Sequence, residues 1–152
     1  AGWATRNSGV MVHCENPKNI GLNQSFPVSI EVQLLGGLES GERPTGNLCT
    51  PGTHVEMNDE LFTPHCINSK SKTYNGDQWV NLEIEVRNDS IIKHFINGEN
   101  VLSYTKPQIG GSIDHNQEYW KKKEGTPLKK GYISLQSESH PVEFKNIEIL
   151  EL

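Results

Sequence analysis

Residues 26–37 read Phe-Pro-Val-Ser-Ile-Glu-Val-Gln-Leu-Leu-Gly-Gly, and this stretch is the best guide to the fold class. Aliphatic residues alternate with polar ones along it, and a period of two is typical of a strand with one buried face. Its polar face carries the carboxylate of Glu31 and the carboxamide of Gln33, which leave the same surface about 7 Å apart. Such a face either lines a polar cleft or is an ordinary exposed surface, and the stretch alone leaves both open.

Other segments of the chain repeat this alternation. They predict strands at residues 10–14, 79–87, 91–96, 101–104, 132–136 and 142–149. Asn97-Gly98 predicts a tight hairpin turn, because both residues accept a positive φ. Residues 38–72 are poorly periodic and predict a long loop with strand fragments, and a short helix is expected near residues 117–123. The whole predicts an all-β antiparallel sandwich, with residues 1–152 as a single domain.

Charge and hydropathy exclude two classes of partner. The net charge of −5 argues against a nucleic acid or an anionic membrane surface, since neither would gain from an acidic protein. The chain has no apolar run near the ~20 residues that would span a bilayer. It begins with Ala1 and shows no signal peptide, which indicates a processed or partial product.

The three cysteines bear on the cellular compartment. Cys49 and Cys66 lie in adjacent turn-rich segments, and a disulfide between them would order the long loop. Such a bond suits a periplasmic or extracellular protein, whereas reduced thiols are the alternative. Cys14 is then left as a small buried residue. A zinc site at Cys49, His54, His65 and Cys66 matches no usual ligand spacing.

Polar residues on three predicted strands are candidates for one site. If the strands are neighbours, a concave polar surface gathers His13, Glu31, Gln33, Gln136 and Glu138. Imidazole, carboxylate and carboxamide groups can together bind sugar hydroxyls, ligate a divalent metal or move protons. The alternative for each residue is simple exposure. Trp3, Tyr119 and Trp120 could stack on a sugar ring or pack their loops, and His94 is expected on the surface.

A set of ordered motifs resembles a known family. The motifs are Asn7-Ser8-Gly9-Val10, Ile30-Glu31-Val32-Gln33-Leu34, Gly76-Asp77-Gln78-Trp79, Asn97-Gly98, Gly131-Tyr132-Ile133-Ser134-Leu135-Gln136 and Val142-Glu143-Phe144-Lys145-Asn146-Ile147. Together they resemble the 3-keto-disaccharide hydrolases, formerly domain of unknown function 1080. The resemblance implies a concanavalin A-like jelly roll. It also implies strands ahead of Asn7 that are either missing here or supplied by a second chain, so we expect association with itself or with a companion polypeptide.

The resemblance further implies a carbohydrate-active enzyme that cleaves glycosides already oxidised at C3. A 3-keto group acidifies the C2 proton, so a base can remove it while the C1 substituent leaves, and water addition completes a net hydrolysis. The base would be Glu31 or His13, and the acid would be Glu138 or His140. A donor such as Gln33 or Gln136 would stabilise the enolate, with a divalent metal on His13 and Glu31 as the alternative.

Two further points concern substrate contacts and competing functions. Asn7 and Trp120 are expected to contact the saccharide. The family often has His-Gly where this chain has Glu138-Ser139-His140, which leaves the acid open between Glu138 and His140. The Glu31 strand lacks the Glu-x-Asp-x-x-Glu spacing of a retaining glucanase. A non-catalytic carbohydrate-binding module on the same fold is the competing function.

Overall fold

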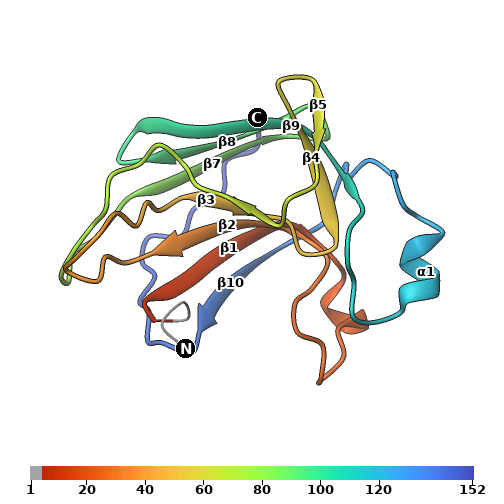
Figure 1. Cartoon of the computed structure of the whole chain (residues 1–152), viewed down its shortest axis with the longest axis horizontal. Helices are drawn as coiled ribbons and strands as arrows, with labels where there is room; N and C mark the ends of the chain where they lie inside the picture. The colour runs from red at the N-terminus through yellow and green to blue at the C-terminus, as the bar shows by residue number, and fades with distance from the viewer. Residues whose placement is uncertain (1–4) are drawn as a thin grey trace.

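The structure is a computed structural model that describes residues 5–152, and in this range two five-stranded antiparallel sheets lie face to face (Figure 1). Sheet A has the strand order β10 (Tyr132–Glu138), β1 (Asn7–Cys14), β2 (Ile30–Leu35), β3 (Asn47–Cys49) and β6 (Cys66–Ile67). Sheet B has the order β5 (Glu60–Phe62), β4 (Thr53–Met57), β9 (Glu99–Ile109), β8 (Ile91–Ile96) and β7 (Leu82–Arg87). The helical segments described are a 3-10 turn at Pro17–Asn19 and α1 at Gln117–Lys121. The predicted antiparallel β-sandwich of the jelly-roll type is confirmed.

The hydrophobic core fills the space between the two sheets. Sheet A contributes Val12, Ile30 and Leu48, which pack against Val55, Ile92, Leu102 and Tyr104 of sheet B. Because side chains alternate along a strand, Glu31, which follows Ile30, points to the opposite, outer face of sheet A. Alternation in residues 26–37 therefore reports correctly which side of the strand meets the core.

His94 lies in this core, so the expectation that it lies on the surface is wrong. It is fully buried, its Nδ1 is 2.8 Å from the Gly46 carbonyl oxygen and its Nε2 is 2.8 Å from the Tyr104 hydroxyl. Both ring nitrogens therefore have partners, which a buried imidazole requires. Burial lowers the pKa of His94 to about 4, so the ring is neutral at physiological pH.

The segment predicted as a long loop contains four short strands, β3 to β6. A disulfide joins Cys49 and Cys66, the pairing expected from the sequence, and it fastens the two-residue edge strand β6 to β3. A crosslink across this separation of 17 residues stabilises the fold by about 3 kcal/mol in the chain-entropy description. Cys14 is a buried free cysteine.

The predicted strand at residues 142–149 is not formed. Among residues 5–152 no strand pairs with this segment, and Ile147 and Ile149 are exposed. Alternation supplies a face to bury, but a strand also needs a neighbour for its backbone hydrogen bonds. The segment is held instead by contacts such as the Lys145 ammonium, which lies 3.9 Å from the ring centre of Trp79. No helix in residues 5–152 is long and apolar enough to cross a membrane.

Candidate functional site

The outer face of sheet A carries a patch of hydrogen-bonding side chains from four neighbouring strands. The strand register places Glu31 opposite Met11 and Cys49, Gln33 opposite Gly9 and Asn47, and Gln136 opposite Gly9. Glu138 lies opposite Asn7 in the next row. We call this patch the polar face, and its members are Asn7, Glu31, Gln33, Asn47, Gln136 and Glu138. Three of the four strands were expected to meet here, and the register brings them together.

Gly9 lies at the centre of the polar face and leaves room for two side chains. A Cβ atom at this position would lie 2.8 Å from Gln136 Oε1 and 3.1 Å from Glu31 Oε1. The side chains of Glu31 and Gln136 therefore converge above the one residue of β1 that has no side chain of its own. A glycine in the Asn7-Ser8-Gly9 motif therefore leaves the space that these two side chains occupy.

Three buried oxygens around Gly9 have no hydrogen-bond partner among residues 5–152. They are Glu31 Oε1, Gln136 Oε1 and Asn7 Oδ1. The Nδ2 group of Asn7 donates to Glu138 Oε2, and Asn47 Nδ2 donates to Gln33 Oε1 at 3.2 Å. Buried acceptors without donors are rare, so a cluster of three indicates a place for donors from outside the chain. Sugar hydroxyl groups are donors of this kind.

The two carboxyl groups of the polar face have raised pKa values. Burial raises the pKa of Glu31 to about 7, and the nearby charge of Glu138 adds to the effect. Burial also raises the pKa of Glu138. Near neutral pH, Glu31 can therefore both accept and release a proton, which is the property a general base needs.

A comparison with protein-family models identifies the fold family. The model of the 3-keto-alpha-glucoside-1,2-lyase-like domain matches residues 1–150. The chain belongs to this family. The resemblance seen in the ordered motifs is thereby confirmed, and with it a carbohydrate-related function for this lyase-like domain. Searches of curated proteins and of solved structures gave no significant match.

His13 of this lyase-like domain does not face Glu31, so the expectation that the two residues share one face is wrong. The pairing of β1 with β10 shifts between Met11 and Cys14, and His13 has a φ of 49°. This bulge turns the ring toward sheet B, where Nε2 lies 3.1 Å from the Asn88 carbonyl oxygen. Burial lowers the pKa of His13.

The bulge also separates the residues expected to hold a divalent metal. His13 and Glu31 lie on opposite sides of sheet A, so they cannot share one ion. Within residues 5–152, no group of three or more His, Cys, Asp or Glu side chains is placed to hold a metal ion. These residues do not fit the expected metal site.

Two further residues expected at the site have other surroundings. Trp120 belongs to α1 and lines a cavity together with His13 and Tyr132, and the residues lining that cavity do not include Glu31 or Gln136. His140 lies just beyond the end of β10, and its Nδ1 is 3.0 Å from the Pro141 carbonyl oxygen. Trp3 lies outside the described residues.

Two members of the site are absent from the sequence-based candidates. Asn47 lies in β3, a three-residue strand within the poorly periodic segment, so alternation gave no signal for it. Gly9 carries no functional group, and its contribution is the space above it. The Asn-Ser-Gly motif includes Gly9, but only the register between β1, β2 and β10 shows which side chains fill the space above it.

Proposed function

We propose that this chain cleaves 3-keto-glycosides by elimination at the polar face, with Glu31 as the base. The observation that carries the proposal is the pair of acceptors above Gly9. Glu31 is buried there, its Oε1 has no hydrogen-bond donor among residues 5–152, and burial raises its pKa to about 7. Membership of the 3-keto-alpha-glucoside-1,2-lyase-like family supports a 3-keto sugar as the substrate.

The proposed reaction begins at C2. Glu31 takes the C2 proton, whose acidity the neighbouring C3 carbonyl raises, and the electron pair of the C2–H bond delocalises onto the C3 oxygen as an enolate. Asn47 occupies Gln33 Oε1, so the Nε2 group of Gln33 is the end that can donate to this oxygen.

The second half of the reaction breaks the C1–O bond. The enolate electrons form a C1=C2 double bond, and the C1 substituent leaves with its electron pair. Glu138, whose pKa burial raises, gives a proton to the leaving oxygen in this step. The products are a 2-hydroxy-3-keto-glycal and the free alcohol. Addition of water across the double bond would make the overall change a hydrolysis.

A carbohydrate-binding module is the second candidate, and the composition of the polar face favours it. Four of its six members are amides, and amides bind sugar hydroxyls without any need for a base. The two candidates differ in the role of Glu31. A binding module would use the Glu31 carboxylate only as a hydrogen-bond acceptor. Because the pKa of Glu31 is raised to about 7, the carboxylate would be protonated at low pH and saccharide binding would weaken.

The test is turnover of a 3-keto-glucoside by Glu31→Gln. This change keeps the shape of the side chain and removes the base, so we expect turnover to fall by about two orders of magnitude or more. Gly9→Ala should also lower turnover, because the new methyl group displaces the side chains of Gln136 and Glu31. Glu83→Gln, in an exposed position on β7, is the matched control. Absence of turnover in the unsubstituted chain, with saccharide binding that Glu31→Gln weakens, would favour the binding module instead.

The disulfide bears on where this activity would take place. We propose a periplasmic or extracellular location, because the bond between Cys49 and Cys66 persists in an oxidising compartment. The partner in this proposal is the saccharide substrate.

A further inference from the structure

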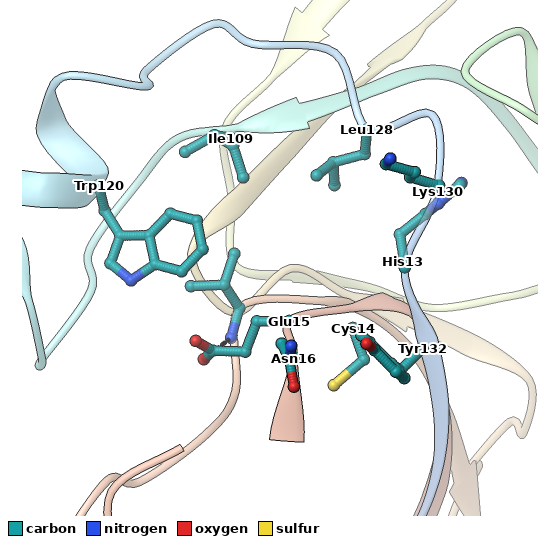
Figure 2. A pocket seen from close by; sticks show the side chains of 11 residues that line it. His13, Cys14, Glu15, Asn16, Ile109, Trp120, Leu128, Lys130 and Tyr132 are labelled. Carbon is teal, nitrogen blue, oxygen red and sulfur yellow. Dashed lines mark hydrogen bonds between the residues drawn. The ribbon is translucent and has the colours of Figure 1, made fainter. Parts of the chain in front are cut away.

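The cavity lined by Trp120, His13 and Tyr132 lies at the end of the sandwich where β1 stops and β10 starts (Figure 2). It has a volume of about 420 Å³, within the range of small-molecule sites. Its apolar lining comes from Val28, Ile109, Leu128 and the half-buried Trp120. We call it the end cavity.

The polar groups of the end cavity are largely occupied within the protein. Glu15 Oε1 accepts from the Val28 backbone N–H at 2.8 Å and from Gln24 Nε2 at 2.6 Å. The same oxygen lies 3.1 Å from His115 Nε2. His13 Nε2 lies 3.1 Å from the Asn88 carbonyl oxygen, so this nitrogen and Glu15 Oε1 already have partners within the protein.

Lys130 differs from these residues. Its side chain has no ion pair or hydrogen bond among residues 5–152, and Figure 2 shows its ammonium turned toward Leu128, on the side of the cavity opposite Glu15. Trp120 and Ile109 lie across the cavity from it in the same view. An aliphatic and aromatic lining with one unpaired cation at its edge fits a flat apolar ring that carries one negative charge.

A saccharide fits this cavity less well. Sugar hydroxyls need donors and acceptors on most sides, and the aliphatic wall of Val28, Ile109 and Leu128 would leave several of them unpaired. We therefore propose that the end cavity binds an aromatic carboxylate of one or two rings, with the ring against Trp120 and the carboxylate on Lys130. This site is separate from the polar face and does not depend on the function proposed for Glu31.

Calorimetric titration of the full chain with 2-naphthoate at neutral pH tests the proposal. Trp120→Ala removes the ring contact and should weaken binding about tenfold, and Lys130→Met keeps the length of the side chain and should weaken it about fivefold. The neutral 2-naphthamide should bind more weakly than 2-naphthoate to the unsubstituted chain. Its affinity should not change in Lys130→Met.

Matched controls separate this site from the polar face and from unspecific effects. Lys122→Met removes an exposed cation that does not line the cavity, and Glu31→Gln alters the polar face, so both should bind 2-naphthoate as the unsubstituted chain does. Trp120→Phe, with a milder loss, replaces Trp120→Ala if the latter does not fold. The proposal would be overturned if the unsubstituted chain did not bind 2-naphthoate. It would also be overturned if the Trp120 and Lys130 variants bound 2-naphthoate as tightly as the unsubstituted chain does. Failure of Glu31→Gln to lower turnover would leave it standing.

Discussion

Glu31 links the chemistry of the polar face to the stability of the fold. Its pKa rises from 4.5 to about 7 on folding because burial disfavours the charged form. Below about pH 4.5 the carboxyl is protonated in both the folded and the unfolded chain. As the pH rises from there to about 7 the unfolded chain loses the proton first, so the free energy of unfolding falls, and above that range it is level.

We expect Glu31→Gln to remove this pH dependence. The rise of the Glu31 pKa from 4.5 to about 7 corresponds to about 3 kcal/mol, so the variant should be more stable than the unsubstituted chain at pH 8 and similar to it at pH 4. Urea unfolding of both proteins across this range measures the difference. Glu83→Gln is the control, and parallel stability curves for the unsubstituted chain and Glu31→Gln would contradict the assignment of a raised pKa.

Individual residues also show where prediction from sequence succeeds. Alternation placed Glu31, Gln33 and Gln136 on one face because β2 and β10 are regular over these positions. Alternation failed at His13, because a bulge turns this side chain to the inner face of sheet A, and no residue type in the sequence marks the bulge. Alternation failed at His94 because the sequence pattern does not distinguish a buried imidazole with two hydrogen-bond partners from an exposed one.

At the scale of elements, the bulge at the end of β1 depends on Gly131. A Cβ atom at Gly131 would lie 2.5 Å from the carbonyl carbon of His13 and 2.6 Å from its Cα. Both atoms belong to the backbone, so the contact cannot be relieved by turning a side chain. The approach of β10 to β1 at this point therefore requires glycine.

Gly131→Ala should loosen the pairing of β10 with β1 and destabilise the protein by about 1–3 kcal/mol, as overpacking usually does. It should also lower turnover, because Gln136 and Glu138 reach the polar face from β10. Chemical denaturation measures the first effect and a kinetic assay the second. Gly21→Ala is the control, since nothing lies within 4 Å of a Cβ atom there. Equal stability of the two variants would show that β10 does not depend on this contact.

Secondary structure in the segment 38–72 was predictable only in part. The fragments near residues 55–57 and 61–62 correspond to β4 and β5, whereas β3 and β6 are too short to show a period. Strands of two or three residues owe their existence to the partners beside them, as β6 does to β3 and the disulfide. The opposite error at residues 142–149 has the same origin, because this alternating segment pairs with no strand in residues 5–152.

At the scale of the whole molecule, one edge of the sandwich exposes apolar side chains that belong to the inner face. Ile133 and Leu135 of β10 are 58% and 45% exposed, although Leu135 pairs with Val10 and so points toward the core side of sheet A. Among the described residues, no strand pairs with the outer edge of β10 at the end of sheet A. Exposed apolar edge strands favour association.

We expect the chain to associate through β10, either with itself or with a companion polypeptide. Light scattering coupled to gel filtration should show a mass above that of one chain, and Leu135→Lys should shift it to the monomer while the circular dichroism spectrum is unchanged. Leu22→Lys alters a fully exposed leucine in a loop and should have no effect. A monomeric unsubstituted chain, purified with no second polypeptide bound, would rule this association out.

The polar face joins strands that are far apart in the sequence, so it assembles late during synthesis. Asn7 and Glu138, which hydrogen-bond to each other, are 131 residues apart in the chain. A ribosome releases β1 and β2 before β10, so Glu31 can reach Gly9 in a nascent chain before Gln136 and Glu138 have emerged. The polar face is therefore complete only after β10 has emerged, and until then the outer edge of β1 is open to pairing with a wrong strand.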